Sequence, residues 1–136
     1  MKKQCWINLP VEDIDRSIKF FTHLGFTVQQ QHGSGQAELF IGDNNVLVML
    51  FPKETFRNFT RNELVDTTKS TEVLFSIDAQ SREEVDELSR KVTEAGGTIF
   101  SAPSNNQGWM YGCGFADPDG HRWNVLYMDR SNMPQG

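Results

Sequence analysis

The sequence predicts an α+β fold made of two βαβββ modules. Three observations lead to this prediction. The order of strands and helices in the first half of the chain recurs in the second half, and each half has a capped helix directly after its first strand. In addition, Val11 at the end of the first strand aligns with Ile77 in the second half. A repeated unit that cannot bury its own apolar face implies two modules packed around a common core.

The first module begins with a strand at 6–11, which the alternation of side chains predicts. Asp13 follows as a helix N-cap, since its carboxylate can accept a hydrogen bond from a free amide of the first turn. Gly25 ends this helix because glycine adopts the left-handed conformation without steric cost. The other strands of the module are expected at 26–31, 37–41 and 46–51, with turns at 33–35 and 42–45 between them.

The second module repeats this order, beginning with a strand at 71–77. Ser81 and Glu84 have the spacing of a capping box, and Gly96 ends the helix that they begin. The Asp-Pro-Asp-Gly sequence at 117–120 predicts a tight turn, because proline presets φ at its first corner and glycine supplies a left-handed residue. The remaining strands are expected at 98–101, 108–115 and 122–128.

The modules are expected at about 3–52 and 70–130 of a single domain, 1–136, with a linker at 53–69. The linker is polar, with a few apolar residues that include Phe56 and Phe59. We therefore expect a short helical turn there and no third domain.

Length and composition limit the classes of function. The 136 residues, 38% of them hydrophobic, suffice for one domain with a core. A net charge of −5 without a basic run argues against nucleic acid and anionic membrane surfaces as partners. No apolar run approaches the roughly 20 residues that cross a bilayer, and none follows Lys2 and Lys3 as in a secretory signal. Cys5 and Cys113 are therefore expected to be reduced thiols of a cytoplasmic protein.

Two sequence stretches at opposite ends of the paired modules resemble a known family. Residues 9–21 read Leu-Pro-Val-Glu-Asp-Ile-Asp-Arg-Ser-Ile-Lys-Phe-Phe, and residues 115–125 read Phe-Ala-Asp-Pro-Asp-Gly-His-Arg-Trp-Asn-Val. Both are similar to the glyoxalase/bleomycin-resistance/extradiol-dioxygenase (vicinal oxygen chelate) superfamily, and Gly-Trp-Met-Tyr-Gly at 108–112 is similar to its predicted lactoylglutathione lyase branch. The resemblance implies that each module curls a mixed sheet into a cup, with the helices on the outer face.

The metalloenzymes of this family carry one metal ligand on each of four strands. The resemblance places these positions at Trp6, Met49, Glu72 and Asn124. An indole offers no donor, a thioether is too soft for the family's ions, and a neutral carboxamide is a weak ligand, so only the glutamate is a strong donor. The three histidines are scattered and have no metal-ligand spacing: His23, His32 and His121. We therefore expect no bound metal and no other cofactor.

Glu72 is the candidate catalytic residue. If its strand alternates regularly, Glu72, Leu74 and Ser76 lie on the cup face. Apolar neighbours there would raise the pKa of the carboxyl group by desolvation and make it a general base. The alternatives are an exposed glutamate at the start of the strand, or a hydrogen-bond partner for Asn124.

A ligand pocket is the second candidate site. Alternation places Trp6, Asn8 and Met49 on the cup face of the first module, and Trp109 or Tyr111 is expected to approach from the strand at 108–115. Apolar walls with a few polar groups suit a small aromatic or amphipathic molecule, although these side chains could instead fill the cup as core. The candidate ligand-binding residues are Trp6, Asn8, Met49, Trp109, Tyr111 and Asn124.

Two functions follow from these observations. The first is a metal-free protein that binds a small organic molecule in the cup, either as a binding protein or as a metal-free enzyme. The alternative is a metal-dependent glyoxalase-like lyase or an extradiol dioxygenase-type enzyme. The family's tendency to pair implies a homodimer.

Overall fold

A computed structural model of the protein describes residues 3–31, 35–42 and 46–132. The chain divides into two compact units, Met1–Asp66 and Thr67–Gly136, which are described separately. Each unit has the order βαβββ and contains one four-stranded mixed sheet, so the predicted α+β fold class is confirmed. No helix in the described part of the chain is long and apolar enough to span a membrane.

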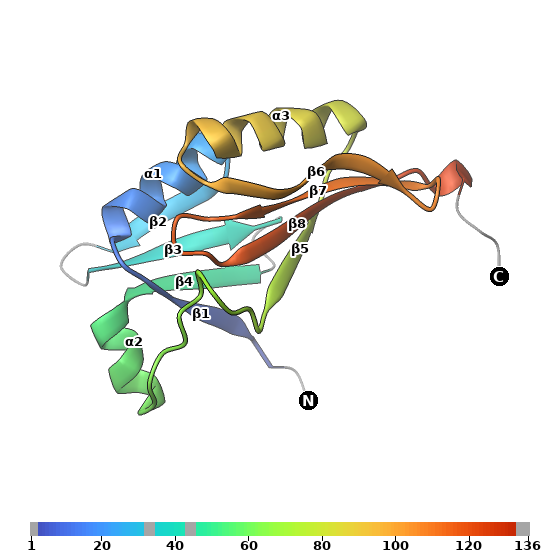
Figure 1. Ribbon diagram of the computed structural model, residues 1–136. Helices are drawn as coiled ribbons and strands as arrows, with labels where there is room; N and C mark the ends of the chain where they lie inside the picture. The colour runs from blue at the N-terminus through green and yellow to red at the C-terminus, as the bar shows by residue number, and fades with distance from the viewer. Residues whose placement is uncertain (1–2, 32–34, 43–45, 133–136) are drawn as a thin grey trace. The chain divides into compact units, whose positions relative to one another are not determined.

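The first unit contains four strands and two helices (Figure 1). Its strands are ordered β1-β4-β3-β2, and only the β1–β4 pair is parallel. As predicted, the carboxylate of Asp13 accepts a hydrogen bond from the amide of Arg16, and Gly25 ends the helix with φ 100°. The elements are β1 (Trp6–Val11), α1 (Ile14–Leu24), β2 (Thr27–Gln31), β3 (Gln36–Ile41), β4 (Val46–Pro52) and α2 (Lys53–Thr60).

The predicted turns at 33–35 and 42–45 fall largely outside the described residues, as does His32. The strands that flank them pair as predicted. β2 is antiparallel to β3, and β3 is antiparallel to β4.

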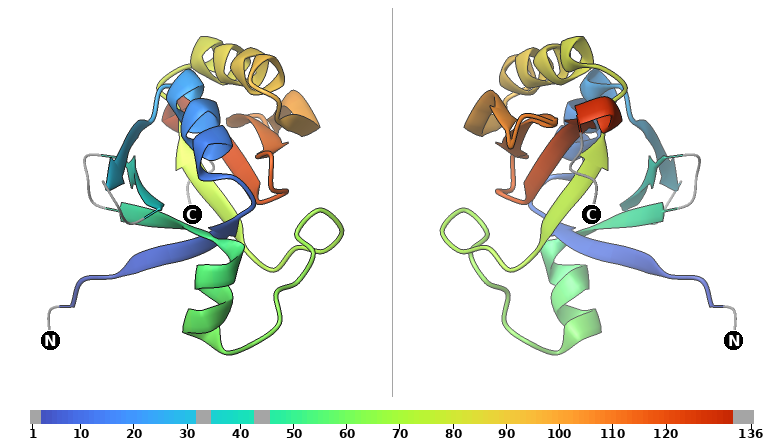
Figure 2. Two further views of the ribbon diagram at one scale, coloured as in Figure 1. Left: turned by 90° about the vertical axis from the view of Figure 1, so that its left-hand side faces the viewer. Right: turned by 90° about the vertical axis from the view of Figure 1, so that its right-hand side faces the viewer.

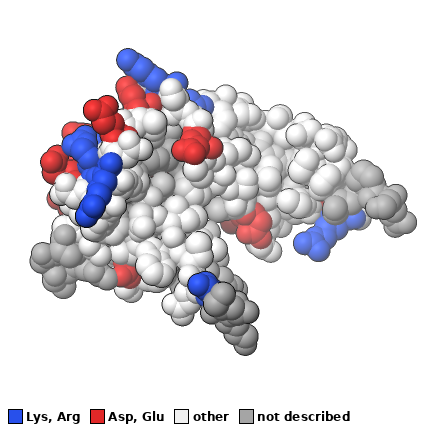
Figure 3. Space-filling view, turned by 90° about the horizontal axis from the view of Figure 1, so that it is seen from below, with Lys and Arg blue, Asp and Glu red and all other residues white. Residues whose placement is uncertain are grey.

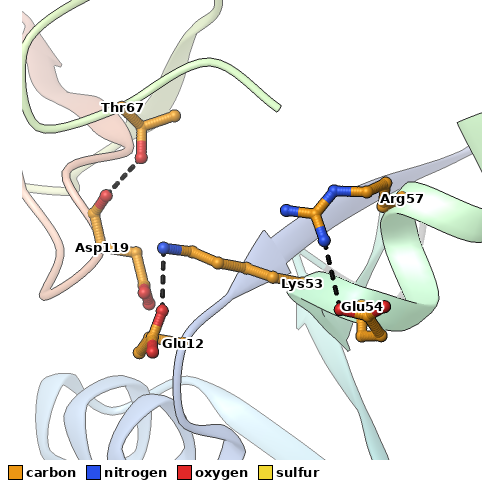
Figure 4. Close-up of polar contacts among 6 residues, drawn as sticks. All are labelled: Glu12, Lys53, Glu54, Arg57, Thr67 and Asp119. Carbon is orange, nitrogen blue, oxygen red and sulfur yellow. Dashed lines mark hydrogen bonds and ion pairs between the residues drawn. The ribbon is translucent and has the colours of Figure 1, made fainter. Parts of the chain in front are cut away.

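Helix α2 is longer than the short helical turn that the sequence predicted. It has eight residues and follows directly from β4 through Pro52 (Figure 2). Lys53 Nζ lies 2.8 Å from the carboxylate of Glu12, at the end of β1, and holds the pKa of that carboxyl group below its usual value (Figure 4). The Phe59 ring also packs edge-on against Phe51 of β4 at 5.1 Å. These tertiary contacts stabilise a helix longer than its local sequence predicts.

The second unit repeats the topology of the first. Its strands are ordered β5-β8-β7-β6, and only the β5–β8 pair is parallel. Ser81 caps its helix by accepting a hydrogen bond from the amide of Glu84, as predicted. The elements are β5 (Leu74–Asp78), α3 (Arg82–Glu94), β6 (Thr98–Asn106), β7 (Met110–Ala116), β8 (Arg122–Met128) and a 3₁₀ turn, η1 (Arg130–Asn132).

Three strands of this unit differ from the prediction, and β7 (Met110–Ala116) is the least changed of them, since it begins two residues later than expected. β5 begins at Leu74 and not at Thr71, so the segment before it is unpaired. β6 continues to Asn106, well beyond the predicted end at Ser101. Shifts in the pairing of β6 with β7 interrupt the regular alternation of side chains by which a strand is recognised in a sequence. Pro103 is tolerated within β6 because β6 is an edge strand.

Each unit has its own buried core. In the second unit, Trp123 of β8 packs between Phe75 of β5 and Phe115 of β7. The centroid of its ring lies 4.6 Å from that of Phe75 and 6.0 Å from that of Phe115. Val85 and Val92 supply the buried positions of α3. The fully buried residues of the first unit include Val11, Phe20, Phe21, Leu39, Val48 and Leu50.

The turn at 117–120 is held by the buried carboxylate of Asp117. Its Oδ1 accepts hydrogen bonds from the backbone amides of Asp119 and His121, both at 3.0 Å. Its Oδ2 accepts one from the indole Nε1 of Trp123 at 3.2 Å. The carboxylate therefore fixes the start of β8.

The same turn packs against the beginning of the second unit. The Thr67 hydroxyl donates a hydrogen bond of 2.5 Å to the carbonyl of Asp119 (Figure 4). A Cβ atom on Gly120 would lie 2.5 Å from the Thr67 carbonyl oxygen, and this residue has φ 88°. Both the close approach and the left-handed backbone require glycine.

Burial raises the pKa of Asp117 to about 6, although the charge of His121 and the hydrogen bond from Trp123 oppose this shift. Between the ordinary aspartate pKa and this value, the folded protein keeps a proton that the unfolded chain has released. This group therefore stabilises the fold below the ordinary pKa, and its contribution is lost as the pH rises through 6.

We expect the contribution of Asp117 to the free energy of unfolding to fall by on the order of 2 kcal/mol between about pH 4 and pH 6. Urea titrations across this pH range give the free energy of unfolding of the wild type and of Asp117→Asn. The contribution of Asp117 is the difference between the two proteins in how steeply this free energy changes with pH. The variant should be less stable overall, because its amide nitrogen faces the indole of Trp123. Asp78→Asn, at an exposed position, should keep the wild-type slope. Equal slopes for the wild type and Asp117→Asn contradict the assignment.

Candidate functional site

In the first unit, the strand register brings Trp6, Asn8 and Met49 onto one face of the sheet. Trp6 pairs with Leu47 and Asn8 pairs with Met49 across the parallel strands. Paired residues point to the same side, opposite the core side chains of alternate positions. We call this side of the first sheet the first candidate face.

A band of polar side chains crosses the first candidate face. Glu38 pairs with Met49, and Gln29 pairs with Glu38. Together with Asn8, they place two amides and a carboxylate in one row. The sequence analysis did not single out Glu38, although its alternation with buried Ala37 and Leu39 carried the necessary signal.

Next to this band lies a hollow of about 700 Å³. Its apolar part includes Trp6, Phe40 and Leu47, which share the first candidate face. The indole of Trp6 is 54% exposed and therefore available for contact. The lining residues are Lys3, Gln4, Cys5, Trp6, Ile7, Phe40, Val46 and Leu47.

In the second unit, Glu72 lies in the unpaired bend before β5 and is exposed, as are Val73 and Leu74. Glu72 therefore precedes the paired strand, which begins at Leu74, and the alternation assumed for its side chain does not extend to it. The cross-strand neighbour of Asn124 is Ser76 and not Glu72.

Asn124 lies on the side of the second sheet that faces away from α3. Ser76 of β5 and Gly114 of β7 are its cross-strand partners. Arg122, two residues earlier on β8, points to the same side and pairs with Leu74. We call this side of the second sheet the second candidate face.

Tyr111 lies on the opposite side of this sheet, which corrects the expectation that it approaches the cup. Its hydroxyl donates a hydrogen bond of 2.6 Å to Asp86 of α3, and this bond raises the pKa of the tyrosine. The guanidinium of Arg82 lies 5.3 Å from the ring centroid. Tyr111 lies three positions before Gly114 on β7, so alternation directs its side chain toward the helix.

Trp109 belongs to the turn before β7. Its carbonyl accepts a hydrogen bond of 2.7 Å from the amide of Asp129. Its indole Nε1 is buried and has no hydrogen-bond partner in the part of the chain that the structure describes. The residue is half-buried. The hydrogen bond to its carbonyl holds it at the end of the β7–β8 pair.

The donor set does not fit the metal that the resemblance implies. Among the described residues, no three His, Cys, Asp or Glu side chains lie close enough to hold an ion. Trp6 and Met49 cannot replace hard ligands, and Asn124 is a weak one. The side chains at the four aligned positions therefore do not form a site for such an ion.

The two cysteines differ in environment. Burial raises the pKa of the Cys113 thiol to about 11, which favours the protonated thiol at neutral pH. Cys5 is exposed, and both thiols are free.

The chain belongs to the Glyoxalase/Bleomycin resistance protein/Dioxygenase superfamily, whose profile matches residues 3–125. No curated protein matches the sequence. Membership of this superfamily agrees with the two βαβββ units and with the Asp-Pro-Asp-Gly turn before the last strand.

Several solved structures are similar to this chain. Hypothetical protein SA1046 from S. aureus is 35% identical with a TM-score of 0.85, and the match covers 93% of this chain and 95% of that one. A glyoxalase/bleomycin resistance protein/dioxygenase family enzyme from Burkholderia phytofirmans is 18% identical with a TM-score of 0.74, covering 90% and 96%. A bleomycin resistance determinant encoded on transposon Tn5 is 21% identical with a TM-score of 0.58, covering 94% and 99%. The last two show a shared fold only.

Proposed function

We propose that this protein binds a small organic molecule on the first candidate face without the metal of the family's metalloenzymes. The observation that carries this proposal is the exposed indole of Trp6 beside the hollow that Phe40 and Leu47 line. Aromatic and aliphatic walls supply the apolar contact, and Asn8 and Glu38 supply polar groups that orient a ligand.

The surface supports a small-molecule ligand over nucleic acid. On the face drawn in Figure 3, acidic and basic side chains stand in small separate groups, and most of the surface is uncharged. The net charge of −5 agrees with this distribution. The free thiols support a cytoplasmic location.

The alternative function is a metal-dependent lyase or an extradiol dioxygenase-type enzyme, with Glu72 as its catalytic residue. The similarity of residues 108–112 to the lactoylglutathione lyase branch favours it. Glu72 is solvent-accessible and is the strong donor among the four aligned positions. The two functions differ in whether metal is bound.

Ligand binding is tested by calorimetric titration with uncharged and charged indole and naphthalene compounds. We expect Trp6→Ala to weaken any compound that binds the wild type by at least about tenfold, because the exposed ring face is lost. Val65→Ala removes an exposed apolar side chain outside the hollow and should leave affinity unchanged. Binding that is equally strong in Trp6→Ala places the ligand elsewhere.

Metal content is tested by elemental analysis of protein purified without chelator. We expect less than about 0.1 metal ion per chain, because sites for Mg or Zn use roughly three or more protein ligands and one strong donor is present here. Near-stoichiometric metal that is lost in Glu72→Ala, and retained in the exposed control Glu83→Ala, would contradict metal-free binding and favour the alternative function.

The family's tendency to pair supports a homodimer. Sedimentation velocity at increasing protein concentration should give a species of twice the 15.5 kDa chain mass. A single species at the chain mass throughout the micromolar range rules out the dimer.

A further inference from the structure

Arg122 is a half-buried arginine on the second candidate face, and no carboxylate among the described residues forms an ion pair with it. Its guanidinium carbon lies 4.4 Å from the ring centroid of Phe100, in a cation–π contact. Its Nε is buried and has no hydrogen-bond partner within the described residues. A guanidinium has five N–H donors and no acceptor, so this side chain has donors to offer.

Other arginines of the protein are paired. Arg57 contacts Glu54, and Arg90 contacts the carboxylates of Glu87 and Glu94. Arg82 donates a hydrogen bond of 2.7 Å to Asn105. These arginines stabilise helix surfaces or a strand end. A partly buried cation without such a partner costs free energy, so packing alone does not account for Arg122.

Two further polar groups lie on the same face of the sheet as Arg122. Asn124 follows two residues later on the same side of β8, and Ser76 lies directly opposite Asn124 on β5. The structure gives neither side chain a hydrogen bond within the described part of the chain. Both groups can donate a hydrogen bond to an oxygen atom.

A glycine makes room for the aromatic ring that contacts Arg122. Gly114 is the cross-strand partner of Asn124, and a Cβ atom added to it would lie 2.5 Å from the Phe100 ring. The ring therefore lies over the backbone of β7 at Gly114, and its cation–π contact restrains the Arg122 side chain.

We infer that Arg122 binds an oxyanion group, either a carboxylate or a phosphate, of a small molecule on the second candidate face. The guanidinium fork matches two oxygen atoms of such a group, and the amide of Asn124 and the hydroxyl of Ser76 complete its hydrogen bonds. The inference goes beyond the proposed function, because it assigns an anion-binding role to residues of the second unit alone.

The experiment compares four probes by ¹H–¹⁵N NMR and calorimetry: 2-naphthoate, 2-naphthyl phosphate, neutral 2-naphthamide, and inorganic phosphate without an apolar part. We expect at least one naphthyl anion to bind the wild type about tenfold more tightly than the amide, as a charge-assisted bidentate contact implies. The preferred anion distinguishes carboxylate from phosphate recognition. The Arg122 Nε–H signal should shift saturably with the preferred anion.

Substitutions of Arg122 test whether this residue causes the preference for the anion. Arg122→Gln should remove the preference for the anion while changing amide affinity less than about threefold, and Arg122→Lys should retain part of it. Arg90→Gln is the matched control, because Arg90 is exposed on α3 and should leave all affinities unchanged. The wild-type comparison of anion with amide keeps the test valid if a variant does not fold.

The outcomes separate this inference from the proposed function. Equal affinity for anions and amide overturns the role of Arg122 and leaves small-molecule binding standing. A saturable shift of the Arg122 signal with inorganic phosphate, without binding of any naphthyl compound, supports the oxyanion site and contradicts the proposed apolar ligand. No shift with any anion overturns the inference.

Discussion

Parallel pairing of the first and last strands of each unit determines which side chains reach the candidate faces. β1 pairs with β4, and β5 pairs with β8, both in an unbroken register. Because side chains alternate along a strand, a slip of one residue would turn Trp6 and Asn8 toward the core and bring Leu9 to the surface. The Asp117 turn protects this register in the second unit, since its carboxylate binds the indole of Trp123 inside β8.

The two candidate faces have different chemistry. The first presents an exposed indole and a polar row that contains Glu38. The second presents Arg122 held by Phe100, with Asn124 beside it. Among the residues that the structure describes, neither face gathers the hard donors that a divalent ion requires, and both faces offer aromatic contact together with hydrogen-bonding groups. A common scaffold supports many activities because the side chains on such faces vary independently of the core.

Much of the fold could be predicted from local sequence signals. The caps at Asp13 and Ser81 and the helix end at Gly25 are as predicted, because each depends on hydrogen bonds or backbone preferences within a few residues. The bounds of β1 and β8 also agree with the sequence. The length of α2 and the extension of β6 were not predictable, since a contact between Phe51 and Phe59 and an irregular strand register leave no periodic pattern.

The sequence by itself determined the chemical character of the positions that the resemblance aligns with the metal ligands of the family's metalloenzymes, because the donor properties of tryptophan, methionine and asparagine do not depend on their surroundings. It also determined the repeated order of strands and helices. Only the tertiary structure decided which residues share a face. It placed Tyr111 beneath α3, left Glu72 outside the sheet, and brought Phe100 onto Arg122 across three strands. These placements depend on strand register and on pairing between distant segments, which no local pattern of residues specifies.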